Sequence, residues 1–269
     1  MKKVFLPAIM FLTLIASCKK DDAPAPQNLL DKVVTKIGTD SLVTTYTYNA
    51  QNRLMGEVQN DPANSETYTT ALNRDNNGRV SKVTYSTVGT TNPGSIGVDF
   101  FYLGATDQKL RNGKSFFVVS GVTINDSMAY EYNGTQVTKT NHYYSTTTVP
   151  YTLIGYYAYT YDARNNITSV KYYEVDAPGS SNFQLLLTYT YVYDDKVNPI
   201  LSKDDALMEF NGSQYISPNN VVSGSYTSVR TPADNYTFTT TYEYRSDGRP
   251  TKSTTTGGGV TLVNTYSYK

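Results

Sequence analysis

The fold can be predicted from one segment whose parts recur along the chain, Tyr159-Thr160-Tyr161-Asp162-Ala163-Arg164-Asn165-Asn166-Ile167. Successive side chains of a strand point to opposite faces, so the two tyrosines share one face and Thr160 takes the other. Glycine and asparagine adopt positive φ more cheaply than other residues. Asn165 is therefore expected to close a β-hairpin as the left-handed residue after a type I turn.

The same turn recurs in four segments that align without gaps. These segments are Tyr48–Leu54, Arg74–Val80, Tyr161–Ile167 and Tyr244–Pro250. Their fifth residues, expected to form the turn, are Asn52, Gly78, Asn165 and Gly248. In three of the four segments Asn or Asp stands second, where its side chain can bond the following backbone and start the turn.

Paired tyrosines lead into these turns and are the candidate ligand-binding residues. The pairs are Tyr46 with Tyr48, Tyr159 with Tyr161, and Tyr242 with Tyr244. Exposed aromatic rings at regular spacing can stack on sugars, but cross-strand aromatic pairs also stabilise a sheet unaided, by roughly 0.2–1 kcal/mol each. The absence of tryptophan favours the structural interpretation. Tyrosines at a sheet edge still leave the sugar-binding interpretation open.

The composition predicts an all-β chain. It contains 26 tyrosines, 9 phenylalanines and many threonines and serines, which suit a pleated, half-buried surface. We expect an elongated, twisted antiparallel sheet built from β-hairpin repeats, with one aromatic and one polar face. A bare aromatic face would be sticky, so the sheet is expected to be curved or partly closed.

The N-terminus predicts export and a lipid anchor. Residues 1–17 have two lysines, an apolar run and a small-residue ending, which is the layout of a signal peptide. Cys18, the only cysteine, follows Ile15-Ala16-Ser17 and resembles the lipidated cysteine of bacterial lipoproteins. We therefore expect residues 18–30 to be a lipidated cysteine with a flexible tether, and residues 31–269 to be the β-hairpin repeat domain. The membrane is then a partner through the lipid.

The repeats resemble the YD repeats of Rhs-type proteins, and more closely those of Bacteroidota lipoproteins of unknown function. The resemblance rests on the four turns, on Tyr193–Pro199, on Asn219-Asn220-Val221 and on the last unit, Tyr242–Pro250. The charged segment Lys19–Asp22 also resembles the surface-export signal of such lipoproteins. The resemblance implies an outer-membrane protein that faces the cell exterior. A toxin function is not implied, because the chain has too few repeats to form a shell.

The chain lacks the residues that most kinds of catalysis need. His142 is the only histidine, which disfavours a histidine-based triad or a multi-histidine metal site, and we expect it to be a strand residue beside aromatics. No metal site and no cofactor are expected, and the zero net charge disfavours nucleic acid. A glycoside hydrolase needs only two facing carboxylates. The candidates for that pair are Glu131, Glu243, Asp194, Asp195, Asp204 and Asp205.

The expected function is that of a non-catalytic, lipid-anchored envelope protein, a surface scaffold or a binding module for a glycan or an envelope protein. A glycan-binding accessory lipoprotein that uses exposed tyrosines is the alternative, and a carboxylate-dependent glycoside hydrolase is the third reading. Ser41 and Ser127 lie in Asp-Ser-apolar motifs that resemble bacterial O-glycosylation sites.

Overall fold

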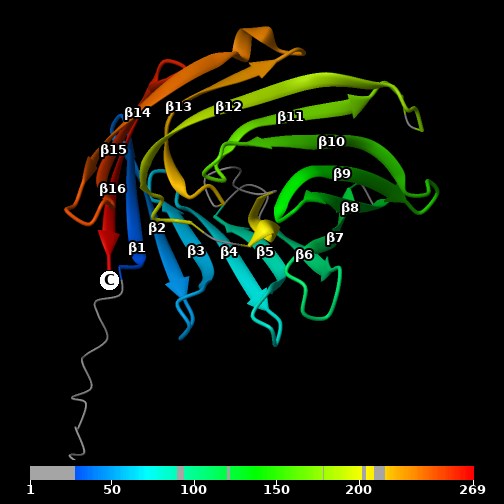
Figure 1. The fold of residues 1–269 in the computed structure, drawn as a ribbon, viewed down its shortest axis with the longest axis horizontal. Coiled ribbons are helices and arrows are strands. Elements are labelled where there is room, and N and C mark those ends of the chain that lie inside the picture. The colour runs from blue at the N-terminus through cyan, green and yellow to red at the C-terminus, as the bar shows by residue number, and fades with distance from the viewer. Residues whose placement is uncertain (1–27, 90–93, 120–121, 178, 202–203, 209–215) are drawn as a thin grey trace, which may run out of the picture.

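The computed structural model describes residues 28–89, 94–119, 122–177, 179–201, 204–208 and 216–269 (Figure 1). Nearly all of these residues lie in antiparallel strands or in the turns that join them. The described residues contain no helix with the length and hydropathy of a transmembrane segment. Two short 3₁₀ helices, η1 (Asp205–Leu207) and η3 (Pro232–Asp234), interrupt the pattern.

The described part of the chain forms sixteen strands. They are β1 (Leu30–Ile37), β2 (Asp40–Tyr48), β3 (Leu54–Asp61), β4 (Glu66–Arg74), β5 (Val80–Val88), β6 (Gly94–Tyr102), β7 (Leu110–Val119), β8 (Val122–Asn133), β9 (Gln136–Thr146), β10 (Thr152–Tyr161), β11 (Ile167–Val175), β12 (Phe183–Val197), β13 (Asn219–Ser228), β14 (Tyr236–Tyr244), β15 (Pro250–Gly257) and β16 (Val260–Tyr268). Each strand pairs with its neighbours in sequence, so the sheet is an antiparallel meander. The prediction of an all-β antiparallel fold is confirmed.

The sheet closes completely, which corrects the expectation of an elongated sheet that is at most partly closed. β1 pairs with β16 along most of its length, with Val33 opposite Tyr266 and Lys36 opposite Val263, so the described strands form a closed barrel (Figure 1). Closure pairs the two edges that an open sheet would expose. It also covers the aromatic face, which an open sheet would leave in water.

The two faces of the sheet differ as the alternation predicts. Leu72, Val83, Phe100, Tyr130 and Tyr159 lie on the inner face and belong to one buried cluster. The residues between them point outward and are mostly threonine, serine and charged residues. A smaller inner cluster of Leu30, Val33 and Tyr46 covers the seam between the first and last strands.

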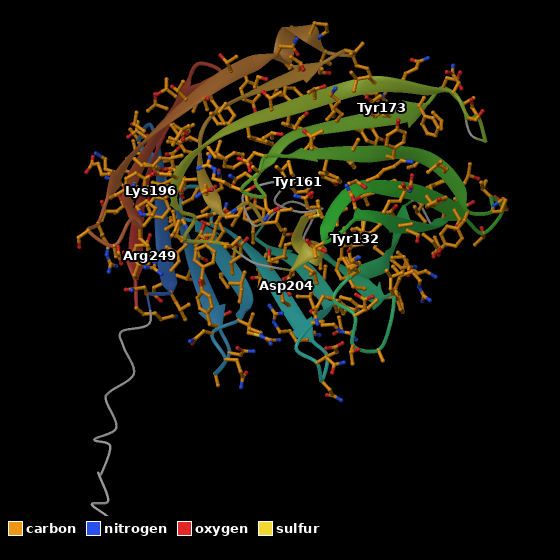
Figure 2. The ribbon with its side chains drawn as sticks, viewed as in Figure 1. Tyr132, Tyr161, Tyr173, Lys196, Asp204 and Arg249 are labelled. Carbon is orange, nitrogen blue, oxygen red and sulfur yellow. The ribbon has the colours of Figure 1, made fainter. Side chains whose placement is uncertain are left out.

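In its described residues, the segment between β12 and β13 lies inside the barrel. Its described part includes η1, where Ala206, Leu207 and Met208 are at most 4% exposed and pack in the main buried cluster. In Figure 2, Tyr132, Tyr161 and Asp204 lie on the inner side of the ring of strands. Sixteen strands enclose enough space for an aqueous channel, so an inserted segment is needed to build a core inside them.

Candidate ligand-binding site

The recurring turns gather at one end of the barrel, which we call the turn end. Asn52, Gly78, Asn165 and Gly248 have φ angles of 61°, 74°, 67° and 81°, in the left-handed region. In each turn the amide of this residue donates to the carbonyl three residues earlier, as Asn165 does to Asp162 at 3.1 Å. The side chain of Asp162 also accepts hydrogen bonds from the amides of Arg164 and Asn166.

Tyrosines from five of the hairpins reinforce the turn end. The strand that leaves a turn begins with a bulge. In β11 the extra residue is Thr168, because Thr160 and Tyr161 of β10 pair with Ser169 and Ile167. Near that point a tyrosine hydroxyl donates to a backbone carbonyl one hairpin away. These bonds are Tyr102 to Val80 at 2.9 Å, Tyr161 to Val137 at 2.8 Å, Tyr193 to Ile167 at 2.6 Å, Tyr242 to Val221 at 3.1 Å and Tyr268 to Pro250 at 2.7 Å. We call them tyrosine latches.

Arg74 replaces the tyrosine in one copy of the repeat and serves two purposes. Its Nε and Nη2 donate to the Leu54 carbonyl, in the position of a latch, at 3.3 and 2.8 Å. The same guanidinium holds Asp204 in a fork, with Nη1 to Oδ1 at 3.0 Å and Nη2 to Oδ2 at 2.8 Å. Its side chain is only 7% exposed. Arg74 therefore fixes the start of η1 to the barrel wall.

Asp205 makes a second link between η1 and the wall. Tyr132 donates its hydroxyl hydrogen to Oδ2 of Asp205 at 3.0 Å, and accepts a hydrogen bond from the Leu110 amide at 2.8 Å. Burial raises the pKa of Asp205 to about 6 even though the bond from Tyr132 lowers it. The neighbouring Asp204 carboxylate adds to the increase.

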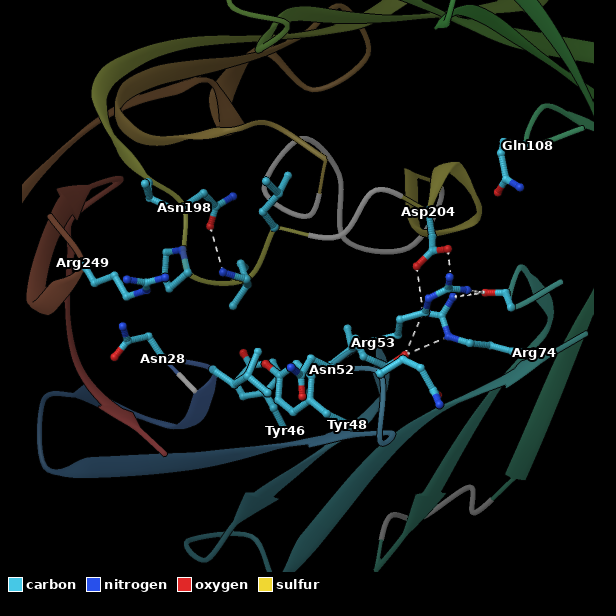
Figure 3. A pocket seen from close by; sticks show the side chains of 18 of the residues that line it. Asn28, Tyr46, Tyr48, Asn52, Arg53, Arg74, Gln108, Asn198, Asp204 and Arg249 are labelled. Carbon is cyan, nitrogen blue, oxygen red and sulfur yellow. Dashed lines mark hydrogen bonds and ion pairs between the residues drawn. The ribbon is translucent and has the colours of Figure 1, made fainter. Parts of the chain in front are cut away.

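A cavity of about 710 Å³ lies at the turn end, between the first hairpins and the inserted segment (Figure 3). This volume is in the range of small-molecule sites. Amide, aromatic and arginine side chains dominate its lining. The lining residues are Asn28, Leu29, Tyr46, Tyr48, Gln51, Asn52, Arg53, Leu54, Arg74, Asn77, Gly78, Gln108, Val197, Asn198, Pro199, Ile200, Leu201, Asp204 and Arg249.

Some polar side chains of the cavity form hydrogen bonds within the protein, whereas others can form them with a ligand. Asn198 donates to the Ser217 carbonyl at 2.9 Å and accepts from the Ile200 amide at 3.1 Å, so it shapes the wall. In contrast, Gln51, Asn52 and Gln108 are exposed, and within the described chain no residue bonds their side-chain amides. These three amides can donate and accept hydrogen bonds toward a ligand.

Tyr46 and Tyr48 are the predicted ligand-binding tyrosines that reach the cavity. Tyr46 is only 8% exposed, whereas Tyr48 is half-buried. Burial raises the pKa of Tyr48 to about 12, and the Asp31 carboxylate adds to the increase. The Tyr48 hydroxyl therefore remains protonated near neutral pH and can donate a hydrogen bond.

The other predicted tyrosines lie away from the cavity. Tyr159 is buried and accepts a bond from Thr140 at 3.3 Å, and Tyr161 forms a latch. Tyr242 forms another latch and lines a small neighbouring cavity of about 80 Å³. Tyr244 bonds the Asp194 carboxylate. All six predicted tyrosines face inward, but the barrel separates the three pairs.

The candidate carboxylates do not gather into a pair across the cavity. Of the described lining residues Asp204 is the only acid, and Arg74 binds it. Glu131 and Glu243 lie on the outer wall, paired with Lys139 and Lys252. Asp194, in β12, accepts a hydrogen bond from the Asn220 amide of β13 at 3.1 Å, and Asp195 pairs with Lys196 at 3.1 Å. This arrangement gives no support to a glycoside hydrolase.

The remaining predicted residues are dispersed. His142 lies on the inner face with its ring against Tyr157 at 5.2 Å between centroids. Ser41 is half-buried in β2, and Ser127 in β8 is only 9% exposed. Cys18 is outside the described residues. Within the described ranges no group of three or more His, Cys, Asp or Glu could hold a metal ion.

The outer wall of the barrel is polar. In β14 the outward residues Thr237, Thr239, Thr241 and Glu243 are all exposed. Lys114 and Lys171 stand exposed near the middles of β7 and β11. Directly opposed ion pairs also cross this face, namely Lys82–Asp99 at 3.3 Å, Lys139–Glu131 at 3.4 Å and Lys252–Glu243 at 2.9 Å. A barrel embedded in lipid needs an outward apolar band about 25 Å tall.

Aromatic side chains on the outer wall gather on part of it. Tyr156 and Tyr173 stack at 4.8 Å between centroids, with Phe183 against the edge of Tyr156. The ammonium of Lys139 lies 4.4 Å from the centroid of Tyr156. Phe116, on β7, is 68% exposed. These aromatics interrupt the polar surface on one side but do not encircle the barrel, because β13 to β16 present mostly hydroxyls there.

The comparisons with known proteins identify the fold. A porin-like protein from Bacteroides vulgatus ATCC 8482 has a similar structure, with a TM-score of 0.54 and 14% identity, and the match covers 90% of this chain and 99% of that one. A porin-like protein from Bacteroides uniformis ATCC 8492 matches with a TM-score of 0.51 and 12% identity over 91% and 98% of the two chains. Likeness at this identity shows the barrel fold alone.

No family model and no curated protein matches the sequence. The resemblance to YD repeats therefore has no support from family models and stays an expectation from the sequence. What the structure establishes is the class: a closed, sixteen-stranded antiparallel barrel in the described residues, with an inserted segment and a polar cavity at the turn end.

Proposed function

We propose that this chain is a non-catalytic, lipid-anchored protein of the outer membrane that binds a saccharide in the turn-end cavity. Acylation of Cys18 would hold the barrel at the membrane, and residues 18–30 would act as the tether. The orientation toward the cell exterior follows from the resemblance of Lys19–Asp22 to a surface-export signal. In this proposal the lipid-anchored envelope protein and the glycan-binding protein expected from the sequence are the same molecule.

The observation that carries this proposal is the composition of the cavity. Saccharides present many hydroxyls, and the cavity offers the unengaged amides of Gln51, Asn52 and Gln108. Tyr48 adds a ring and a protonated hydroxyl at the same place. A concave site with a few convergent polar groups is the usual form of a small-molecule site.

The polarity of the outer wall supports the inference that the barrel is surrounded by water and does not form a pore in a membrane. Placing a lysine at the bilayer midplane on a lipid-facing strand costs about 2–4 kcal/mol, and Lys114 and Lys171 lie near the middles of their strands. The many exposed threonines on β14 add to this cost. The structural neighbours are called porin-like, but this chain has a polar exterior and an apolar interior at the inserted segment.

A glycan array probed with the purified full-length protein in detergent tests the proposal. We expect retention on at least one class of oligosaccharide, and loss of that signal in Tyr48→Ala. Tyr173→Ala, which removes an aromatic ring from the outer wall, is the matched control and should bind as the wild type does. Absence of binding to every glycan, or equal loss in both variants, would contradict a saccharide site at Tyr48.

A further inference from the structure

The charges of the cavity are not balanced. Asp204 is neutralised by the fork that Arg74 forms with it. Arg53 also lines the cavity and is exposed, and its Nη1 donates to the Gly78 carbonyl at 2.6 Å. Among the described residues, no carboxylate forms an ion pair with Arg53. One positive charge is therefore left beside the amides of Gln51 and Asn52.

A second positive charge remains around Arg249. Arg249 and Arg245 share one carboxylate, that of Asp247, at 3.2 and 3.0 Å. Two guanidiniums against one carboxylate leave a net charge of +1. Arg245 also donates to Oδ1 of Asn28, which lines the cavity, at 3.2 Å. The surplus charge is thus held against the cavity wall.

The two surplus charges lie on different sides of the cavity. Figure 3 shows Arg249 with Asn28 on one side, and Arg53 toward the side where Arg74 holds Asp204. Arginine presents a planar fork of N–H donors that matches a carboxylate. A ligand with a single carboxylate would meet one of these arginines, whereas an extended ligand with several carboxylates would meet both.

We propose that the cavity binds an oligosaccharide that carries more than one uronic acid, with its carboxylates against Arg53 and Arg249. This inference rests on the proposed function and narrows it to one substrate class. The neutral amides and Tyr48 would contact the sugar hydroxyls, and the two arginines would select for acidic sugars. Binding should then weaken as the salt concentration rises, because Arg53 is exposed and Arg249 is partly exposed, so dissolved ions screen both charges.

Calorimetry with two probes of the same shape tests the inference. The probes are trigalacturonic acid and its fully methyl-esterified form, which keeps the sugar rings but has no charge. With the full-length protein we expect the acid to bind at least about tenfold more tightly, since hydrogen bonds to charged groups are stronger than neutral ones. Raising the salt concentration should reduce this preference.

Variants connect the preference to the two arginines. In Arg53→Gln/Arg249→Gln the acidic probe should bind only as tightly as the ester binds to the same variant. Arg111→Gln removes the same charge from an exposed residue outside the cavity lining and should keep the preference. A circular dichroism spectrum like that of the wild type would show that the double variant folds.

The outcomes separate the two proposals. If both probes bind equally well, the acidic preference is wrong and saccharide binding stands. If the double variant folds and still prefers the acid, the assignment to Arg53 and Arg249 is wrong. If neither probe binds although the glycan array shows a neutral saccharide, the inference fails alone. If no saccharide binds in either experiment, both proposals fail.

Discussion

Asp204 and Asp205 are adjacent in the chain, yet their carboxylates have different partners on the barrel wall. Arg74 compensates the charge of Asp204, whereas the hydroxyl of Tyr132 is what faces Asp205. Burial raises the pKa of Asp205 from 3.8 to about 6, because the hydrogen bond from the Tyr132 hydroxyl offsets only part of the desolvation. The attachment of η1 to the barrel wall therefore depends on pH.

The sign of this dependence follows from proton binding. The folded protein binds the Asp205 proton more tightly than the unfolded chain does, so the stability from this group is full below a pH of about 4. It is lost as the pH rises through 6, the value to which burial raises the pKa. Above that pH the fold carries the cost of a buried charge.

We predict that Asp205→Asn increases the free energy of unfolding at pH 7.5 by roughly 2 kcal/mol, because a neutral amide avoids the buried charge. The gain should shrink toward zero at pH 3.5, where the wild-type carboxyl is protonated in both states. Urea unfolding at the two pH values measures the difference. Asp234→Asn, at an exposed position in η3, should change neither value. An equal gain at both pH values would disprove the role of ionisation.

At the scale of the strand, the tyrosines act through their hydroxyls as well as through their rings. Each latch joins a strand to a carbonyl one hairpin away, as Tyr161 does to Val137 and Tyr193 does to Ile167. The rings fill the inner face at the same time. This explains why the spacing of the tyrosines follows the hairpins, whether or not a ligand is bound.

We predict that Tyr161→Phe and Tyr193→Phe each lower the free energy of unfolding by about 1–2 kcal/mol, since the first leaves a part-buried carbonyl and the second a buried carbonyl without its hydroxyl donor. The ring stays, so the packing is preserved. Tyr173→Phe on the outer wall serves as the control and should cost less than about 0.5 kcal/mol. Urea titrations followed by circular dichroism give these values. Equal effects at all three positions would mean that the latches contribute nothing.

The hairpins could be predicted from the sequence because their signals are local. The tyrosine alternation and residues such as Asn165 act within one turn, and Tyr46 and Tyr48 were already candidates for binding. Arg53 and Arg74 were not identified as site residues, although both stand in the aligned repeats. The replacement of tyrosine by Arg74 in its column was the available signal, because a guanidinium on an aromatic inner face requires an acidic partner.

Closure could not be predicted, because it depends on a pairing between the two ends of the domain. No local pattern in β1 or β16 specifies that Val33 will lie opposite Tyr266. The number of strands and their stagger must fit together before a barrel can close, and this is a property of the whole sheet. The cavity could not be predicted for the same reason, since its walls come from residues far apart in the sequence, such as Asn28, Arg53 and Asn198.

The polar outer wall and the proposed lipid anchor together predict that the whole molecule is held at the membrane by its acyl chains alone. A barrel that spans a membrane stays there through its lipid-facing strands, whereas a barrel held only by acyl chains on Cys18 is released when they are lost. We therefore replace residues 1–18 by the cleavable signal peptide of a secreted, non-lipidated protein and express both forms in the same cells. The wild type should sediment with the membranes, and the replaced form should remain in the soluble fraction without detergent.

A known membrane-spanning barrel given the same signal peptide is the control, and it should sediment in every case. Folding of the released form is checked by the circular dichroism spectrum of its strands. If the replaced form is folded and still sediments with the membranes, and leaves them only in detergent, then lipid contacts along the strands hold it there. The water-exposed barrel would then be wrong, and exposed Lys114 and Lys171 would need another environment inside the bilayer, since an isolated charge on a lipid-facing strand is strongly disfavoured.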